Sequence, residues 1–166
     1  HFLEHQMDLL VTQDEYFNYL ESAIKKSPTE ITIATYGMWI GVMPDGRDKS
    51  NSRTRRILEM MRSVKTVKIV IGLYEYNSCK NWSTCLDCER KYALGLIRLL
   101  NHVDIFPEFQ WKVVTEMHVK YVLFTYADSK KSGITGSRNF TDSSWDDVTV
   151  TLDKTNISKF EDIADK

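Results

Sequence analysis

The chain has 166 residues, of which 42% are hydrophobic, and a formal net charge of −1. This length suits one globular domain with its own core, and the balanced charge excludes a protein that is basic over its whole surface. No apolar run approaches the roughly 18 residues of a membrane-spanning helix, so no membrane span is expected. Three cysteines, an odd count, argue against a closed disulfide framework and favour a cytoplasmic (intracellular) setting.

Helical and strand patterns alternate over the first hundred residues. Apolar spacing predicts an amphipathic helix over residues 13–26, which Pro28 ends, and a β-rich run predicts a strand over residues 31–36. Ser52 is a suitable N-cap for a second helix that reaches about Ser63. Further strands are expected over residues 67–73, 110–115, 119–125 and 147–152, and further helices over residues 87–101 and from about residue 158.

This order of elements predicts the α/β class, as a layered α/β/α sandwich with a mixed central sheet. Helices between the first strands favour parallel pairs, whereas short connections later in the chain favour antiparallel pairs. We expect residues 1–166 to form a single catalytic domain. Such a domain is also compatible with a larger protein that carries, for example, a separate DNA-reading domain.

A polar pattern over residues 118–139 is the most informative feature of the chain. His118 and Lys120 begin an apolar strand and, because they lie two residues apart, their side chains point to the same face. Ser137 and Asn139 follow in the sequence Gly-Ser-Arg-Asn. A histidine nucleophile, a cation and short hydrogen-bond donors suit attack on a phosphodiester, where negative charge grows on the equatorial oxygens.

Together these segments resemble the HKD signature of the phospholipase D superfamily: His-x-Lys, four residues, Asp, six residues, then Gly-Ser-x-Asn. Here Thr125 stands at the Asp position, and ten residues separate it from Gly136. Asp128, in this longer loop, is one candidate substitute for the missing carboxylate. The order of elements resembles the single-motif nuclease branch, and the resemblance covers the chain from about Tyr16 onward.

The resemblance implies a phospholipase D/nuclease-like fold and a metal-independent phosphodiesterase, a hydrolase that forms a covalent phosphohistidine on His118. Family members often carry an acidic residue after the Asn, where it orients the catalytic histidine. Asp146 or Asp147 falls in that region. A carboxylate on one ring nitrogen fixes the tautomer and leaves the other nitrogen free to attack.

The chain contains only one His-x-Lys pair, because His1, His5 and His102 are not followed by lysine at that spacing. Two histidines are needed when one attacks the phosphorus and another protonates the leaving oxygen. We therefore expect a symmetric homodimer in which His118 of each subunit meets across a two-fold axis. The resemblance implies the same, since family members with one motif per chain are dimers.

Local basic charge favours nucleic acid, DNA or RNA, as the substrate. Arg53, Arg55 and Arg56 fall in the first turn of the second predicted helix, where a cation opposes the helix dipole by about 0.3–1 kcal/mol. A helix that tolerates them there is a candidate for binding phosphates without sequence selectivity. Further charge is expected near the catalytic pair from Arg138, Lys130 and Lys131.

Trp39 is a candidate for stacking on a base. The alternative is that Trp39 belongs to the core and that the arginines form a solvated face. A lipid phosphodiesterase is a further alternative, with residues 38–43 as its apolar rim. The alternative from another class is a non-catalytic nucleic-acid-binding or regulatory module that kept the fold, with Thr125 as a sign of lost activity.

No cofactor is expected for catalysis. Cys79, Cys85 and Cys88 have the spacing of a structural zinc site that still lacks a fourth ligand, for which His102 is a candidate. The alternative is three unrelated thiols, with Cys88 near the start of a helix.

Overall fold

A computed structural model of the chain describes residues 7–36, 52–72, 108–114, 117–141 and 146–164. The predicted helix over residues 87–101 lies outside these ranges. The described elements, in chain order, are β1 (Leu9–Leu10), α1 (Gln13–Lys25), β2 (Glu30–Thr35), α2 (Arg53–Met61), β3 (Thr66–Gly72), β4 (Gln110–Val114), β5 (Lys120–Thr125), β6 (Lys131–Gly136), β7 (Thr149–Thr151) and α5 (Lys154–Ala164).

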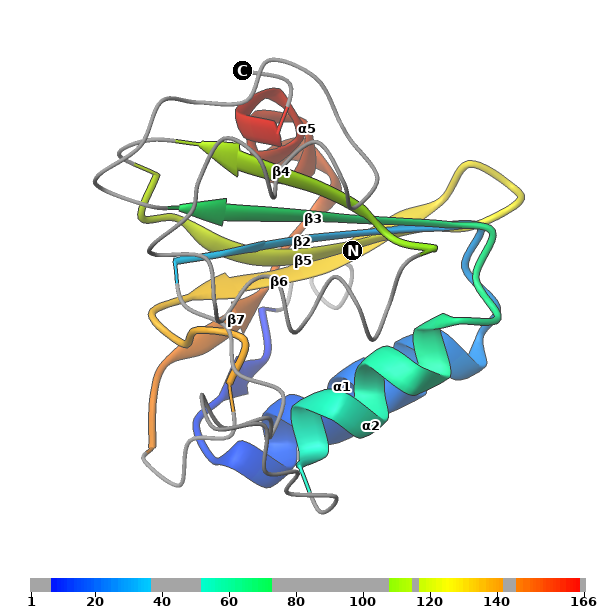
Figure 1. Cartoon of the computed structure of the whole chain (residues 1–166). Helices are drawn as coiled ribbons and strands as arrows, with labels where there is room; N and C mark the ends of the chain where they lie inside the picture. The colour runs from blue at the N-terminus through cyan, green and yellow to red at the C-terminus, as the bar shows by residue number, and fades with distance from the viewer. Residues whose placement is uncertain (1–6, 37–51, 73–107, 115–116, 142–145, 165–166) are drawn as a thin grey trace, which may run out of the picture.

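The described strands form one mixed seven-stranded sheet in the order β1-β7-β6-β5-β2-β3-β4 (Figure 1). β2, β3 and β4 run parallel, whereas β5 is antiparallel to both β2 and β6. The α/β class and the mixed sheet expected from the sequence are confirmed. Because of these directions, the carboxyl ends of β2, β3 and β6 meet the amino end of β5 along one edge of the sheet.

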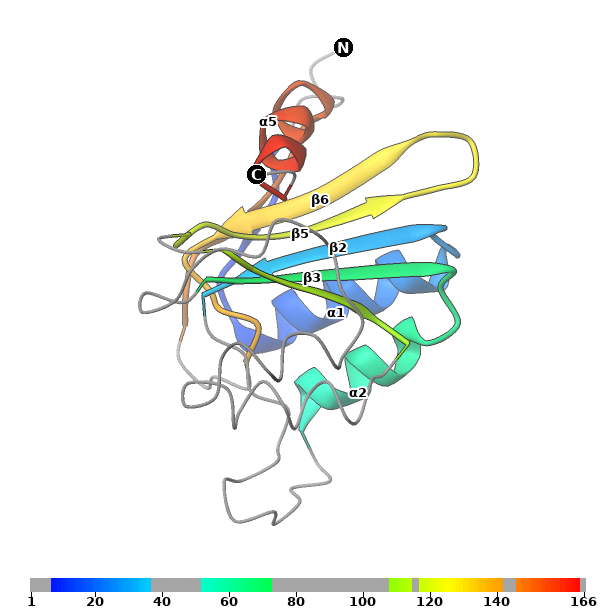
Figure 2. The ribbon, with the colours of Figure 1, turned by 45° about the horizontal axis from the view of Figure 1, so that its top comes forward.

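Helices pack against both faces of this sheet. Figure 2 shows α1 and α2 on one side and α5 on the other. Side chains of α1 and α2, such as Phe17 and Leu58, join strand residues including Ile33 and Phe124 in one buried cluster. Ile157 of α5 belongs to a second buried cluster. Since alternate strand residues enter different clusters, each strand of the sheet centre is buried on both faces.

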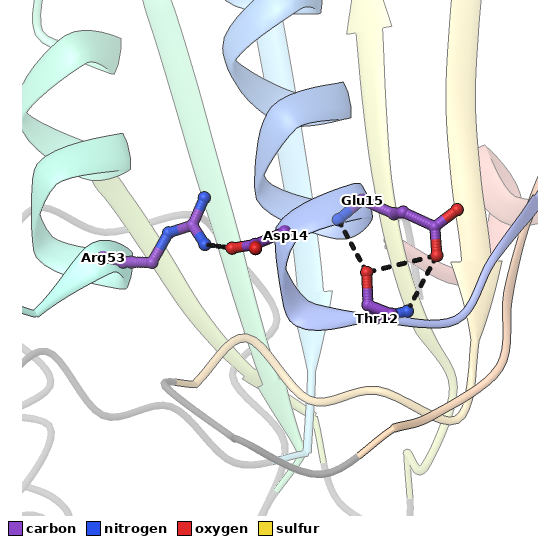
Figure 3. Close-up of polar contacts among 4 residues, drawn as sticks. All are labelled: Thr12, Asp14, Glu15 and Arg53. Carbon is purple, nitrogen blue, oxygen red and sulfur yellow. Dashed lines mark hydrogen bonds and ion pairs between the residues drawn. The ribbon is translucent and has the colours of Figure 1, made fainter.

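The amino end of α1 is held by a capping box, drawn in Figure 3. The Thr12 hydroxyl accepts a hydrogen bond from the Glu15 backbone N–H at 3.1 Å, and the Glu15 carboxylate accepts one from the Thr12 N–H at 3.1 Å. These bonds satisfy donors that a helix start leaves unpaired. The predicted helix is confirmed, and its buried residues recur at helical spacing: Tyr16, Phe17, Leu20, Ala23 and Ile24.

Thr12→Ala is expected to lower the free energy of unfolding by about 1 kcal/mol, because it removes the cap. Thr12→Ser keeps the hydroxyl and is the matched control. Backbone hydrogen bonds from Thr12 and then Val11 lower the pKa of Glu15. The ionised Glu15 carboxylate therefore adds to the free energy of unfolding at neutral pH, and this stabilisation is lost as the pH falls through the lowered pKa of Glu15. Thermal unfolding measures the effect, and equal midpoints for Thr12→Ala and Thr12→Ser would exclude a stabilising role for this cap.

The segment between Thr125 and Gly136, expected to be a loop, is largely the strand β6. It forms a hairpin with β5 in which Lys131 pairs with Thr125 and Gly136 pairs with Lys120. The polar residues at the start of β6 are typical of a loop, and for this reason the strand was not predicted. In the structure β6 pairs with β5 on one side and with β7 on the other.

This register corrects two expectations about the motif. Lys131 lies five strand residues from Lys120, or roughly 17 Å away at about 3.3 Å per residue, so Lys130 and Lys131 do not add charge beside His118 and Lys120. Thr125 lies at the same distant end, where its carbonyl accepts from the Thr29 N–H at 2.7 Å. Asp128 accepts the Lys130 N–H at 3.0 Å in the hairpin turn. It therefore supports that turn and not the site.

Candidate active site

The two halves of the motif meet at the sheet edge described above. Lys120 is the first residue of β5 and Gly136 is the last residue of β6, and the two are directly paired. His118 therefore precedes one strand at the point where Ser137 follows the other. Hairpin pairing, and not closeness in sequence, brings together the residues that the motif predicted.

His118 and Lys120 are in direct contact. The Lys120 ammonium donates to the His118 carbonyl at 2.8 Å and lies 3.0 Å from the Nδ1 atom of the same residue. Lys120 is only 6% exposed, whereas the His118 side chain is exposed. The arrangement presents an imidazole to solvent with a fixed cation behind it.

Burial lowers the pKa of the Lys120 ammonium, and the negative charge of Asp147 opposes that shift. The lysine is thus held in a site that disfavours its charge, with a carboxylate close enough to offset part of the cost. An anionic ligand beside Lys120 would act on this ammonium in the same direction as Asp147.

Ser137 and Asp147 form the second part of the site. The Ser137 hydroxyl donates to the Asp147 carboxylate, and the Ser137 backbone N–H donates to the Val148 carbonyl at 3.0 Å. The Val148 N–H donates in turn to the same Asp147 oxygen at 2.9 Å. Of the two predicted acids, Asp147 therefore contacts the motif through Ser137, and the neighbouring Asp146 is exposed.

Asn139 is anchored by a residue that the sequence did not indicate. The Thr35 hydroxyl, at the end of β2, donates to the Asn139 side-chain oxygen at 3.4 Å and accepts the Phe140 backbone N–H at 3.0 Å. Thr35 is fully buried. The β-rich run predicted a strand at this position. Nothing in the sequence indicated that this strand, β2, pairs with β5 and so brings Thr35 to the motif.

Tyr36 is the second residue that sequence reasoning missed. Its ring centroid lies 4.8 Å from that of His118, and the Lys120 ammonium lies 5.9 Å from the same Tyr36 ring. Tyr36 thus contacts the imidazole and the cation together. A polar aromatic residue at the end of a predicted strand was the available clue.

The arginines at the start of α2 differ in what they contact. Arg53 forms an ion pair with Asp14 of α1, shown in Figure 3, and its guanidinium lies 4.8 Å from the Phe17 ring centroid. Its charge is therefore engaged in joining the two helices. Arg55 is half-buried and Arg56 is exposed. Figure 1 shows α2 running antiparallel to β3, so this basic turn points toward the edge where β3 ends.

Arg138 lies inside the fold, although it was predicted to bind substrate. Only 4% of it is exposed, its guanidinium donates to the Val11 carbonyl at 3.2 Å, and it lies 5.4 Å from the Tyr16 ring centroid. These contacts tie the motif to the start of α1. The sequence could not show this, because the arginine follows an exposed serine in a polar stretch.

The comparisons with known proteins concern the fold. No family model and no curated protein matches the sequence. The fold is similar to that of TrmBL2, an archaeal chromatin protein. The TM-score is 0.50 at 12% identity, over 98% of this chain and 52% of that chain. Yeast tyrosyl-DNA phosphodiesterase matches with a TM-score of 0.48 and 9% identity, over 88% of this chain and 31% of that chain. This chain thus spans about half the length of the first and about a third of the second.

Several predicted features lie outside the described residues, namely Trp39 and the cysteines Cys79, Cys85 and Cys88. Within the described ranges, no group of three or more His, Cys, Asp or Glu side chains is placed to hold a metal ion. No helix in the described part of the chain is long and apolar enough to cross a membrane.

Proposed function

We propose that the protein is a metal-independent phosphodiesterase, and specifically a nuclease that cleaves DNA or RNA through His118. The observation that supports this most strongly is the contact of an exposed His118 with a buried Lys120 at the sheet edge where Ser137 and Asn139 arrive. These residues combine a nucleophile, a cation and hydrogen-bond donors on a rigid sheet, as phosphoryl transfer requires.

In the proposed reaction, a ring nitrogen of neutral His118 attacks the phosphorus. A nitrogen–phosphorus bond forms while the bond from phosphorus to the leaving oxygen breaks. His118 of the partner subunit, in its protonated form, gives its proton to that leaving oxygen. Water then attacks the phosphorus of the phosphohistidine, and the same partner histidine takes up a proton from the water. A bond from the water oxygen to phosphorus forms while the nitrogen–phosphorus bond breaks, which releases the phosphate product and restores neutral His118.

The remaining site residues have supporting roles in this proposal. Lys120 and Asn139 stabilise the growing charge on the equatorial oxygens of the phosphate. Ser137 holds Asp147 at the site, because its hydroxyl donates its single hydrogen to that carboxylate. Because these groups come from the ends of strands and adjoining turns, they need little rearrangement before reaction.

A homodimeric site can be tested by mixing subunits. Wild-type and His118→Ala chains are unfolded together, refolded at equal amounts and assayed for cleavage. If every site needs His118 from two subunits, random pairing leaves about a quarter of the wild-type activity, whereas independent subunits leave about half. Mixing with Lys130→Ala, at the distant hairpin turn, is the control and leaves activity unchanged. A value of one half would overturn the shared site.

The proposal that the substrate is nucleic acid rests on the basic first turn of α2. Arg55→Ala combined with Arg56→Ala is expected to weaken binding and to reduce the log–log salt dependence of the binding constant by about two. The matched control, Arg62→Ala with Lys65→Ala, removes the same charge just beyond the other end of α2. Equal salt slopes for the two double variants, measured by fluorescence anisotropy with labelled oligonucleotides, would rule out this basic face.

A second candidate is a nucleic-acid-binding module without catalysis. It is favoured by the fold similarity to an archaeal chromatin protein whose structure shows a mode of DNA binding. Binding without cleavage of single- and double-stranded DNA and RNA would support it. A lipid phosphodiesterase would instead cleave a phosphodiester lipid.

Two further features stay predictions: a structural zinc ion on Cys79, Cys85 and Cys88, and an intracellular setting. Metal analysis of the purified protein tests the zinc site.

A further inference from the structure

We propose that Thr35 is a positioning residue of this site, whose hydroxyl turns the amide donors of Asn139 toward the phosphate. That the ligand is a phosphate rests on the proposed function. The coupling between Thr35 and Asn139 rests on the hydrogen bond between them in the structure. The two residues lie 104 positions apart in the chain, so this bond connects the end of β2 directly to the motif.

The sheet places Thr35 beside the catalytic lysine. The paired register of β2 and β5 includes Ala34 opposite Tyr121, so Thr35 and Lys120 are the next neighbours across these strands. Both side chains fall on the sheet face covered by α1 and α2, because Ile33 and Val122, two residues away in each strand, belong to the same buried cluster. An amide held by Thr35 is therefore held within reach of the Lys120 ammonium.

The direction of the Thr35–Asn139 hydrogen bond then gives the direction of the amide. The Thr35 oxygen accepts the Phe140 N–H at 3.0 Å, and its single hydrogen is donated to the Asn139 oxygen at 3.4 Å. With its oxygen directed at Thr35, the planar amide presents its NH₂ group on the opposite branch. An NH₂ group stabilises an anionic oxygen, whereas the amide oxygen would repel it. By donating to the amide oxygen, Thr35 thus holds the orientation in which the NH₂ group points away from Thr35.

The decisive comparison is between Thr35→Val, which has nearly the same shape without the hydroxyl, and Thr35→Ser, which retains it. In cleavage assays run well below the unfolding temperature of each variant, Thr35→Val is expected to lower kcat at least tenfold with KM changed less than threefold. Thr35→Ser is expected to stay within threefold of wild type in both. A purely packing role predicts the reverse order, since serine loses the methyl group and valine does not.

A double-mutant cycle shows whether Thr35 acts through Asn139. In an Asn139→Ala background, Thr35→Val is expected to change kcat less than twofold, because the amide that it positions is already absent. Independent effects that multiply would overturn the inference.

A readout that needs no activity separates this inference from the proposed function. The Asn139 side-chain NH₂ signals of ¹⁵N-labelled protein are assigned by their loss in Asn139→Ala. They are expected to shift in Thr35→Val and to remain in place in Thr35→Ser. If the wild type cleaves no nucleic acid but the signals behave in this way, the proposed function fails and the positioning role stands. Unchanged signals in Thr35→Val overturn the positioning role whatever the activity.

Discussion

Replacing His118 with alanine is expected to abolish cleavage, with kcat lower by at least about a thousandfold. The reason is chemical, since the proposed reaction forms its bond to phosphorus at the exposed imidazole beside Lys120. Steady-state cleavage of labelled oligonucleotides, with EDTA present, measures this loss.

The same variant is expected to keep its stability. His118 precedes β5 and its side chain is exposed, so its removal opens no cavity in the core. Thermal unfolding should show a midpoint close to that of wild type, and binding of the uncleaved oligonucleotide should persist. Lys130→Ala, in the hairpin turn at the opposite end of β5, is the control with full activity. Cleavage by His118→Ala at more than a tenth of the wild-type rate would contradict a histidine nucleophile.

Gly72→Ala is expected to cost about 3 kcal/mol of unfolding free energy and most of the activity. Gly72 ends β3, and a Cβ atom built on it would lie 1.9 Å from the Met117 backbone oxygen. No side-chain rotation relieves an overlap with backbone, so the segment at Met117 has to move. His118 is the next residue, and its displacement from Lys120 and Tyr36 accounts for the loss of activity. Urea unfolding and cleavage assays measure the two effects.

Gly133→Ala separates the loss of stability from the loss of activity. A Cβ atom at Gly133 would lie 2.6 Å from the Leu123 side chain and 2.8 Å from the Val122 oxygen, within β5 and away from Met117. This variant should also lose stability, but its folded fraction should cleave at close to the wild-type rate. If Gly72→Ala retained wild-type activity per folded molecule, the close approach of Met117 would have no role in placing His118.

Patterns within single elements were predictable from sequence, because they depend on local spacing. The helical periodicity of α1 and the Ser52 cap of α2, where the hydroxyl accepts the Arg55 N–H at 3.2 Å, are confirmed. The start of β5 at Lys120 is close to its prediction. The C-terminal helix begins at Lys154, before the predicted start near residue 158.

Contacts between distant segments were not predictable in this way. β1 has two residues and no pattern of its own, and β6 begins with polar residues. The buried position of Arg138 and the pairing of Thr35 with Asn139 depend on which strands lie side by side. A single sequence contains no record of that order. The motif indicated which residues would carry the proposed chemistry, whereas the sheet supplies the residues that hold them.

The most direct test of the central claim is to trap the intermediate on His118. Protein is mixed with a cleavable oligonucleotide in EDTA, quenched in alkali, in which phosphohistidine is stable, and digested for mass spectrometry. A nucleotide adduct is expected on the peptide that contains His118, formed at least as fast as turnover and absent from His118→Ala. Cleavage without any adduct, or an adduct on another residue, would contradict it.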